Sequence, residues 1–173
     1  MRRWLVVVGV TVMGCSTVLL AQSPASLIIG MWKQNMERST YSPGPPPPRG
    51  SGSVRQYAAG DDGAVVAITM TISPQGLPTL GAVSAANYDG KEYIQHTVAT
   101  LATSLGRHVE PRVARTISYT PVDPYTVEIV QKQDGRVVSK SLRTISRDGK
   151  TLTESFTVAQ GEPVANVLVF DRQ

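Results

Sequence analysis

The sequence predicts an all-β protein, an antiparallel up-and-down meander that closes as a barrel of about 8–9 strands. The main observation is a turn signal: Asp-Gly occurs at four places, each flanked by runs rich in Val, Ile and Thr. Asp-Gly supplies the positive φ angles that a two-residue hairpin turn needs. The runs are also regularly spaced and show almost no helical periodicity, a combination typical of β-barrels and β-sandwiches.

Length and composition indicate one folded domain. The 173 residues are 41% hydrophobic and 17% charged, which is too apolar for a disordered chain. The one cysteine excludes an intramolecular disulfide and a Cys-based zinc site. We therefore expect a barrel domain over 22–173, with no domain boundary inside it.

The first 21 residues (1–21) have the layout of a secretory signal and do not belong to the expected fold. Arg2 and Arg3 form a basic start, and the segment that follows is mostly apolar or small. Cleavage is expected between residues 21 and 26. It follows either Ala21 or Ala25, and Ala25 fits better because Ser23 supplies a small residue at the −3 position. The sequence therefore predicts an exported protein, periplasmic or extracellular.

Two other interpretations of this segment stay open. The run 12–15 resembles a lipobox, in which Cys15 would carry a lipid and anchor the chain to a membrane. The apolar run is also just long enough to span a bilayer as an uncleaved anchor. Loss of a signal with Arg2 and Arg3 lowers the formal net charge from +4 to +2. So small a charge, with no basic stripe, argues against nucleic acid as a partner.

Nine candidate strands follow the signal. They cover 31–37, 54–59, 64–72, 79–87, 112–120, 125–133, 136–146, 150–158 and 163–171. The apolar residues of 97–105 follow the spacing i, i+3, i+4, i+7, so a short helix is slightly favoured there over a strand. The Pro- and Gly-rich segment 42–53 is expected to be a spacer between the first two strands. A docking site for a proline-reading module is the alternative.

Five short motifs occur along the chain in a fixed order. They are G-x-W-K-x-N at 30–35, S-P-G-P at 42–45, Y-D-G-K at 88–91, D-G-K-x-L-T at 148–153 and N-V-x-V-F-D at 166–171. With them the chain resembles the lipocalin-like (calycin-type) proteins, in particular small exported bacterial members of uncharacterised function. The resemblance covers most of residues 30–173 and implies an up-and-down barrel.

The resemblance also implies a structural role for three residues at one end of the barrel. In such proteins the tryptophan of the G-x-W motif packs across the closed end, and an arginine from the last strand lies over its ring. Gly30, Trp32 and Arg172 match these positions. A cation–π contact of this kind contributes about 0.5–2 kcal/mol. We expect Trp32 to be structural, since a barrel end needs a large plug.

A charged group on the C-terminal strands is the best candidate for a ligand site. If the last two Asp-Gly turns are both tight, Arg143 faces Glu154 and lies diagonal to Glu128, all on one face of three neighbouring strands. If that face is the interior, Arg143 would anchor a ligand carboxylate in an apolar cavity, with the two glutamates setting its charge balance. If it is the exterior, the group is a surface ladder of ion pairs worth about 0–1 kcal/mol each. The sequence leaves this choice open.

Apolar residues complete the expected ligand site. Phe156 shares the face of Arg143, and strand 64–72 alternates clearly, with Val66, Ile68 and Met70 on the face expected to be core or cavity lining. The expected function is binding of a small, largely apolar ligand. The alternative is a structural or interaction domain of the cell envelope whose barrel is filled by its own side chains, since a small barrel can do either.

No pattern in the sequence indicates an enzyme. Most aspartates lie in predicted turns, where local hydrogen bonding explains them. The two histidines, His96 and His108, fit no metal-binding or nucleophile motif. We therefore expect no catalysis, no cofactor and no metal. Membrane contact is expected only through the N-terminal signal or a lipid on Cys15.

Overall fold

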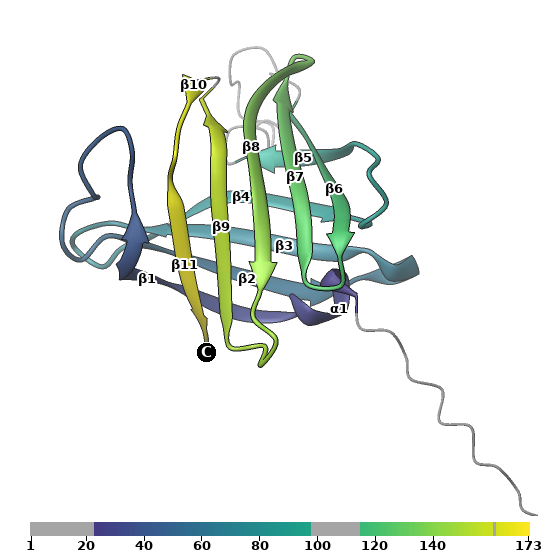
Figure 1. Cartoon of the computed structure of the whole chain (residues 1–173), viewed down its shortest axis with the longest axis horizontal. Helices are drawn as coiled ribbons and strands as arrows, with labels where there is room; N and C mark the ends of the chain where they lie inside the picture. Colours follow the sequence, from purple (N-terminus) through teal and green to yellow (C-terminus); the bar gives the residue numbers. More distant parts are fainter. Residues whose placement is uncertain (1–22, 98–114, 161) are drawn as a thin grey trace, which may run out of the picture.

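A computed structural model of the chain describes residues 23–97, 115–160 and 162–173 (Figure 1). A short helix, α1 (Pro24–Leu27), precedes the strands, and a 3₁₀ turn, η1 (Asp61–Gly63), lies between the second and the third strand. The strands are β1 (Gly30–Thr40), β2 (Gly52–Ala59), β3 (Val65–Ile72), β4 (Pro78–Ala86), β5 (Tyr93–Thr97), β6 (Arg115–Asp123), β7 (Thr126–Gln133), β8 (Arg136–Ile145), β9 (Thr151–Ala159), β10 (Glu162–Pro163) and β11 (Val167–Arg172). The described residues are all-β apart from these two short turns of helix.

Ten of the described strands form a closed antiparallel ring. From β1 to β9 each strand pairs with the next along the chain, and β9 also pairs with β11. The ring closes where β11 pairs with β1, so the first and last strands are neighbours. The two-residue β10 pairs antiparallel with the end of β9. The predicted antiparallel barrel is confirmed, but it has ten strands rather than about eight or nine.

The strand that the sequence pattern missed is β5. Its residues have an inverted pattern: Ile94 is 66% exposed, whereas Gln95 is 8% exposed and faces Ser84 on the neighbouring strand. Alternating hydrophobicity is the usual signal of a half-buried strand, and five residues with a polar one inside do not give it. Most of the segment expected to be helical (97–105) lies outside the described residues, so that expectation stays untested.

The Asp-Gly pairs join strands through loops of different lengths. Asp134 and Gly135 both have positive φ, 50° and 76°, and Gln133 pairs with Arg136 across them. This is the tight two-residue turn that the sequence predicts between β7 and β8. The Asp-Gly pair between β8 and β9 lies in a longer loop of residues 146–150.

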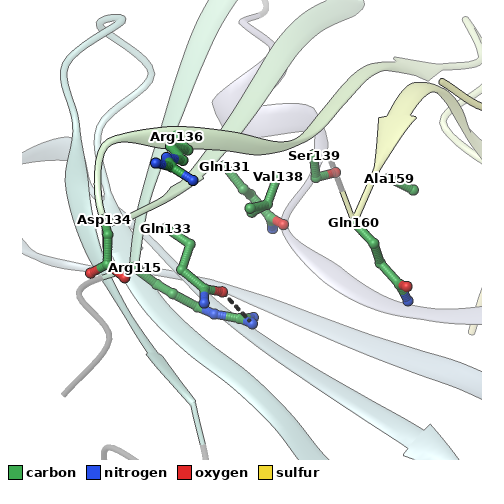
Figure 2. Close-up of a pocket in the computed structure, with 9 residues that line it drawn as sticks. All are labelled: Arg115, Gln131, Gln133, Asp134, Arg136, Val138, Ser139, Ala159 and Gln160. Atoms are coloured by element: carbon green, nitrogen blue, oxygen red, sulfur yellow. Dashed lines mark hydrogen bonds between the residues drawn. The ribbon is translucent and has the colours of Figure 1, made fainter. Parts of the chain in front are cut away.

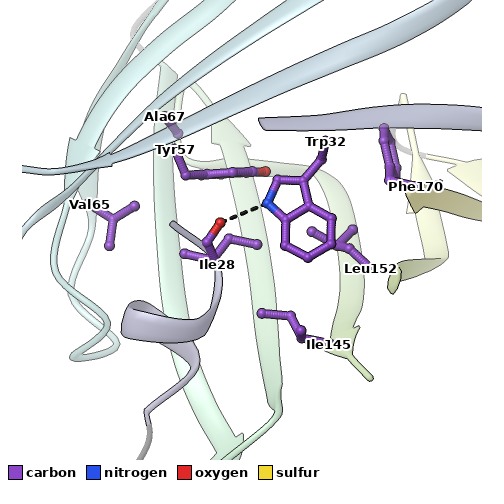
Figure 3. Packing of buried hydrophobic residues seen from close by; sticks show 8 residues of the cluster. All are labelled: Ile28, Trp32, Tyr57, Val65, Ala67, Ile145, Leu152 and Phe170. Carbon is purple, nitrogen blue, oxygen red and sulfur yellow. Dashed lines mark hydrogen bonds between the residues drawn. The ribbon is translucent and has the colours of Figure 1, made fainter. Parts of the chain in front are cut away.

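One end of the barrel is closed by α1 and the residues that follow it (Figure 3). Ile28 and Trp32 are 1% and 0% exposed, and they pack in one cluster with Ile145 and Leu152 from the C-terminal strands. The indole Nε1 of Trp32 donates a hydrogen bond of 2.7 Å to the Ile28 carbonyl oxygen, the dashed line in Figure 3. Trp32 therefore plugs this end of the barrel, which is the position that the family resemblance implies.

Arg172 holds this plug in place. Its guanidinium lies 4.4 Å from the centre of the Trp32 ring. It also donates hydrogen bonds of 2.5–2.8 Å to the carbonyl oxygens of Leu27, Ile29 and Gly149. A Cβ at position 30 would lie 3.0 Å from the Arg172 Nη1, so Gly30 leaves the room that this side chain needs. One arginine thus ties the end of α1, the start of β1 and the β8–β9 loop together.

The segment 42–53 leads from β1 into β2, where the spacer was expected. Its residues 42–50 are exposed. The expected signal (1–21) with Cys15 lies outside the described residues and stays a prediction. Among the described residues no helix is long and apolar enough to cross a membrane.

Candidate functional site

Arg143 and Glu154 meet inside the barrel. Arg143 on β8 pairs with Glu154 on β9, the pairing that the sequence pattern predicts. The Nε and Nη2 atoms of Arg143 donate hydrogen bonds of 3.2 and 3.1 Å to Oε2 of Glu154, and Ser141 Oγ donates one of 2.9 Å to Oε1. All three residues are at most 5% exposed. The face of β8 and β9 that the sequence left undecided is therefore the interior.

Glu128 does not join them, and the expected shared face is wrong for this residue. The tight turn starts the β7–β8 pairing in the expected register, but a bulge on β8 at Val138 shifts it by one residue. Glu128 then faces Leu142 instead of Ser141. A slip of one residue moves a side chain to the other face of the sheet. Glu128 consequently lies on the outer face, where it forms an ion pair of 2.9 Å with Lys140.

Glu128 was expected to be the third member of this group, diagonal to Arg143, whereas a second arginine, Arg55 on β2, completes it. Its Nη1 forms an ion pair with the carboxylate of Glu154, and its guanidinium lies 4.3 Å from the centre of the Phe170 ring. Sequence reasoning missed Arg55 because no hairpin links β2 to β9, and the two meet only across the closed ring. The available signal was the spacing of two from Tyr57, which places both side chains on one face of β2.

Arg55, Glu154 and Arg143 form a buried ion cluster with a net charge of +1, since two guanidinium groups face one carboxylate. Burial by itself raises the pKa of Glu154, but the charges of Arg55 and Arg143 outweigh it and lower the pKa to about 2. Glu154 is therefore ionised at neutral pH. The rings of Tyr57 and Tyr119 lie 5.2 and 5.8 Å from the Arg143 guanidinium and favour its charged form.

Three residues expected to line the interior lie instead on the outer face of β3, half-buried: Val66, Ile68 and Met70. The interior residues of this strand are Val65 and Ala67, which are 4% and 9% exposed. Ala67 pairs with Tyr57 on β2, so a small side chain is needed where the neighbouring strand contributes a large one. Hydrophobicity alone favoured the wrong face because the outer face of β3 carries the larger apolar side chains, whereas Thr69 and Thr71 lie on the face of Val65 and Ala67.

A pocket of about 820 Å³ lies at the other end of the barrel, between the ends of β6, β7, β8 and β9 (Figure 2). Its polar lining consists of Arg115, Gln131, Gln133, Asp134, Arg136, Ser139 and Gln160, and its apolar lining of Val138 and Ala159. Arg115 is held in place by a hydrogen bond of 2.9 Å from its Nη2 to Gln133 Oε1 (Figure 2). The volume lies within the range of small-molecule sites. We call this site the mouth pocket.

The mouth pocket belongs to the interior side of the barrel wall. Ser139 lies two residues from Ser141 and four from Arg143 on β8, so the three side chains point to the same side. At a rise of about 3.3 Å per residue, Arg143 lies about 13 Å beyond Ser139 along the strand. Between them Ser141 is 2% exposed, and Phe156 lies opposite it, half-buried. Packed side chains therefore separate the pocket from the ion cluster.

The other candidate groups are scattered over the described residues. His96 is exposed on β5, and His108 lies outside the part of the chain that the structure describes. Within that part, no group of three or more His, Cys, Asp and Glu side chains comes together in a way that could hold a metal ion.

Comparison of the chain with family models, with curated proteins and with solved structures found no match of any of the three kinds. Fold and site therefore define the class: a closed antiparallel β-barrel, filled by side chains at one end and with a polar pocket at the other. This barrel is compatible with the calycin-type architecture.

Proposed function

We propose that this protein is a lipocalin-like barrel that binds a small molecule in its mouth pocket. The observation that carries the proposal is the contrast along the barrel interior. The inner residues at the closed end are almost fully buried, whereas about 820 Å³ of space stays open beside Ser139 and Gln131. Ligand sites of small barrels commonly lie in the barrel mouth, and one molecule of moderate size fits such a volume.

The lining of the pocket modifies the expected ligand chemistry. A largely apolar ligand fits Val138 and Ala159, but the other lining residues carry amides, a hydroxyl or charges. A ligand with an apolar part and several hydrogen-bonding groups would use both kinds of contact. Specificity in such sites comes from a small number of placed polar groups.

Binding is proposed here in preference to catalysis. A general acid or base needs a pKa near the working pH and access to the substrate. Burial raises the pKa of Glu154, but Arg55 and Arg143 outweigh this effect and lower the pKa to about 2. Packed side chains also lie between Glu154 and the mouth pocket. The carboxylate serves better as a fixed counter-charge than as a proton carrier.

Export is the second part of the proposal. The basic and apolar start of the chain supports a signal that delivers the barrel to the periplasm or the outside of the cell. A barrel that is held together without disulfides, closed by Trp32 and Arg172, suits such a compartment.

The proposal is tested by filling the pocket. Ser139→Trp places a large ring in the mouth, and Leu142→Trp adds the same ring to the outer face of the same strand, where Leu142 is 43% exposed. We expect native mass spectrometry of protein purified from its own host to show one small molecule per chain in the wild type and in Leu142→Trp, but not in Ser139→Trp. Titration with the fluorescent probe anilinonaphthalene sulfonate should separate the variants in the same way. Thermal unfolding of both variants verifies that each is folded.

The alternative function, a structural domain of the cell envelope, is favoured by the filled closed end. It predicts the bare chain mass in all three proteins and no difference in probe binding between them. That result would overturn the proposed ligand site.

A further inference from the structure

We propose that the ligand of the mouth pocket is a small organic acid, bound through a single carboxylate. This inference rests on the proposed function and specifies the ligand class for the same pocket. It follows from two layers of positive charge, one in the pocket lining and one beneath it.

The first layer is the lining itself. Arg115 and Arg136 stand against one acid, Asp134, so the charged lining groups sum to +1. Arg115 starts β6 and Arg136 starts β8, so the two arginines come from different strands that meet at the same opening. Because Gln133 accepts a hydrogen bond from Arg115, that guanidinium is already oriented before any ligand arrives. Preorganised donors lose less entropy on binding.

The second layer is the ion cluster of Arg55, Glu154 and Arg143, also with a net charge of +1. Its Arg143 lies about 13 Å from Ser139 along β8, at the strand rise of about 3.3 Å per residue, and its Glu154 is nearer, since it accepts a hydrogen bond from Ser141. Its groups are at most 8% exposed, so mobile salt screens their field less than that of surface charges. The bulge at Val138 contributes to the positive net charge of the cluster. It turns Glu128 outward and so leaves one carboxylate rather than two beside the arginines.

The neutral donors of the pocket indicate a carboxylate rather than a phosphate. Gln131, Gln160 and Ser139 supply amide and hydroxyl hydrogens beside the arginines. A lining charge of +1 balances one carboxylate, whereas a phosphate group carries about −1.5 to −2 at neutral pH. Val138 and Ala159 leave an apolar strip for the rest of the acid.

The experiment is isothermal titration calorimetry of the full-length mature protein with octanoate, with octanamide of the same length, and with inorganic phosphate. We expect octanoate to bind about tenfold more tightly than octanamide, because charge-assisted hydrogen bonds are the stronger kind. Arg136→Gln should weaken octanoate about tenfold and leave octanamide unchanged. Arg147→Gln makes the same charge change in the β8–β9 loop at the closed end and should alter neither.

Three outcomes decide against the inference. Equal affinities for octanoate and octanamide overturn the inference that the ligand is bound through a carboxylate. They leave the proposed binding in the mouth pocket intact. Inorganic phosphate binding as tightly as octanoate overturns the choice of a single-charge acid. Absence of octanoate binding overturns the inference, and if anilinonaphthalene sulfonate also fails to bind, the proposed function fails with it.

Discussion

The two ends of the barrel are built from different kinds of side chain. At the closed end, Trp32 and Leu152 are 0% exposed and belong to one packed cluster, and the guanidinium of Arg172 lies over the Trp32 ring. At the open end, the inward residues are half-buried polar ones such as Gln131 and Ser139, which leave a pocket between them. The same ring of strands thus has one end filled by packed side chains and one end with a pocket, where we propose that a ligand binds. Changes at the two ends should therefore separate stability from affinity.

The largest effect is expected from Trp32→Ala. This change opens a cavity at the closed end and removes both the hydrogen bond to Ile28 and the stacking with Arg172. We expect the free energy of unfolding to fall by about 5 kcal/mol. Urea unfolding measures it, with Arg136→Gln as the control at the open end, where a loss within about 0.5 kcal/mol is expected. Similar losses in the two variants would contradict the division between the ends.

A smaller effect is expected from Glu154→Gln, which leaves Arg55 and Arg143 buried with no carboxylate between them. Removing one partner of a buried pair is costly, and we expect a loss of about 3 kcal/mol in unfolding free energy. The matched variant is Glu128→Gln on the outer face, where the ion pair with Lys140 is partly exposed. Its loss should be about 0–1 kcal/mol. Equal losses would show that Glu128 shares the interior, and that the bulge at Val138 is absent.

These two glutamates also show how far the sequence could predict the site. The pairing of Arg143 with Glu154 was predicted because the two residues lie equally far from Asp148-Gly149 on either side of the β8–β9 loop. This pairing is confirmed. The position of Glu128 depends on a bulge at Val138, a residue that carries no sequence signal of a bulge such as glycine. Strand pairing can be predicted from turn residues only as far as the first irregularity.

Arg55 and β5 escaped prediction for a different physical reason. The pairing of sequential strands is local, whereas the contact of Arg55 with Glu154 crosses the barrel and exists only after closure. In β5 the exposed Ile94 and the buried Gln95 reverse the hydrophobic pattern. The fold class and most strands were predictable because turns and alternation are local. The interior cluster and the pocket were not, because closure creates them.

The third prediction concerns acid stability. The pKa of Glu154 falls from 4.5 to about 2 on folding, because Arg55 and Arg143 outweigh the effect of burial. A lowered pKa stabilises the fold above the unfolded value, and this contribution of about 3 kcal/mol is lost as the pH falls toward 2. Urea unfolding of the wild type should therefore become easier between about pH 4.5 and pH 2. Glu154→Gln should lose this part of the pH dependence, while Glu128→Gln should keep it.

The smallest effect is expected at the start of the mature chain, and it concerns how much of α1 the closed end needs. Ser23 Oγ accepts a hydrogen bond of 3.3 Å from the Ser26 backbone N–H, and Pro24 is buried. Signal cleavage after Ala25 would remove both residues, whereas cleavage after Ala21 keeps them. Loss of a helix cap and of a buried proline costs about 1–2 kcal/mol.

We therefore expect the exported chain to begin at Gln22, although the small residue at the −3 position favours a later cut. The intact mass of the exported protein measures the start directly, and urea unfolding of chains that begin at Gln22 and at Ser26 measures the difference in stability. A start at Ser26 with unchanged stability would contradict the prediction. It would mean that Trp32 and Arg172 close the barrel without the first turn of α1, and that the closed end depends on side-chain packing alone.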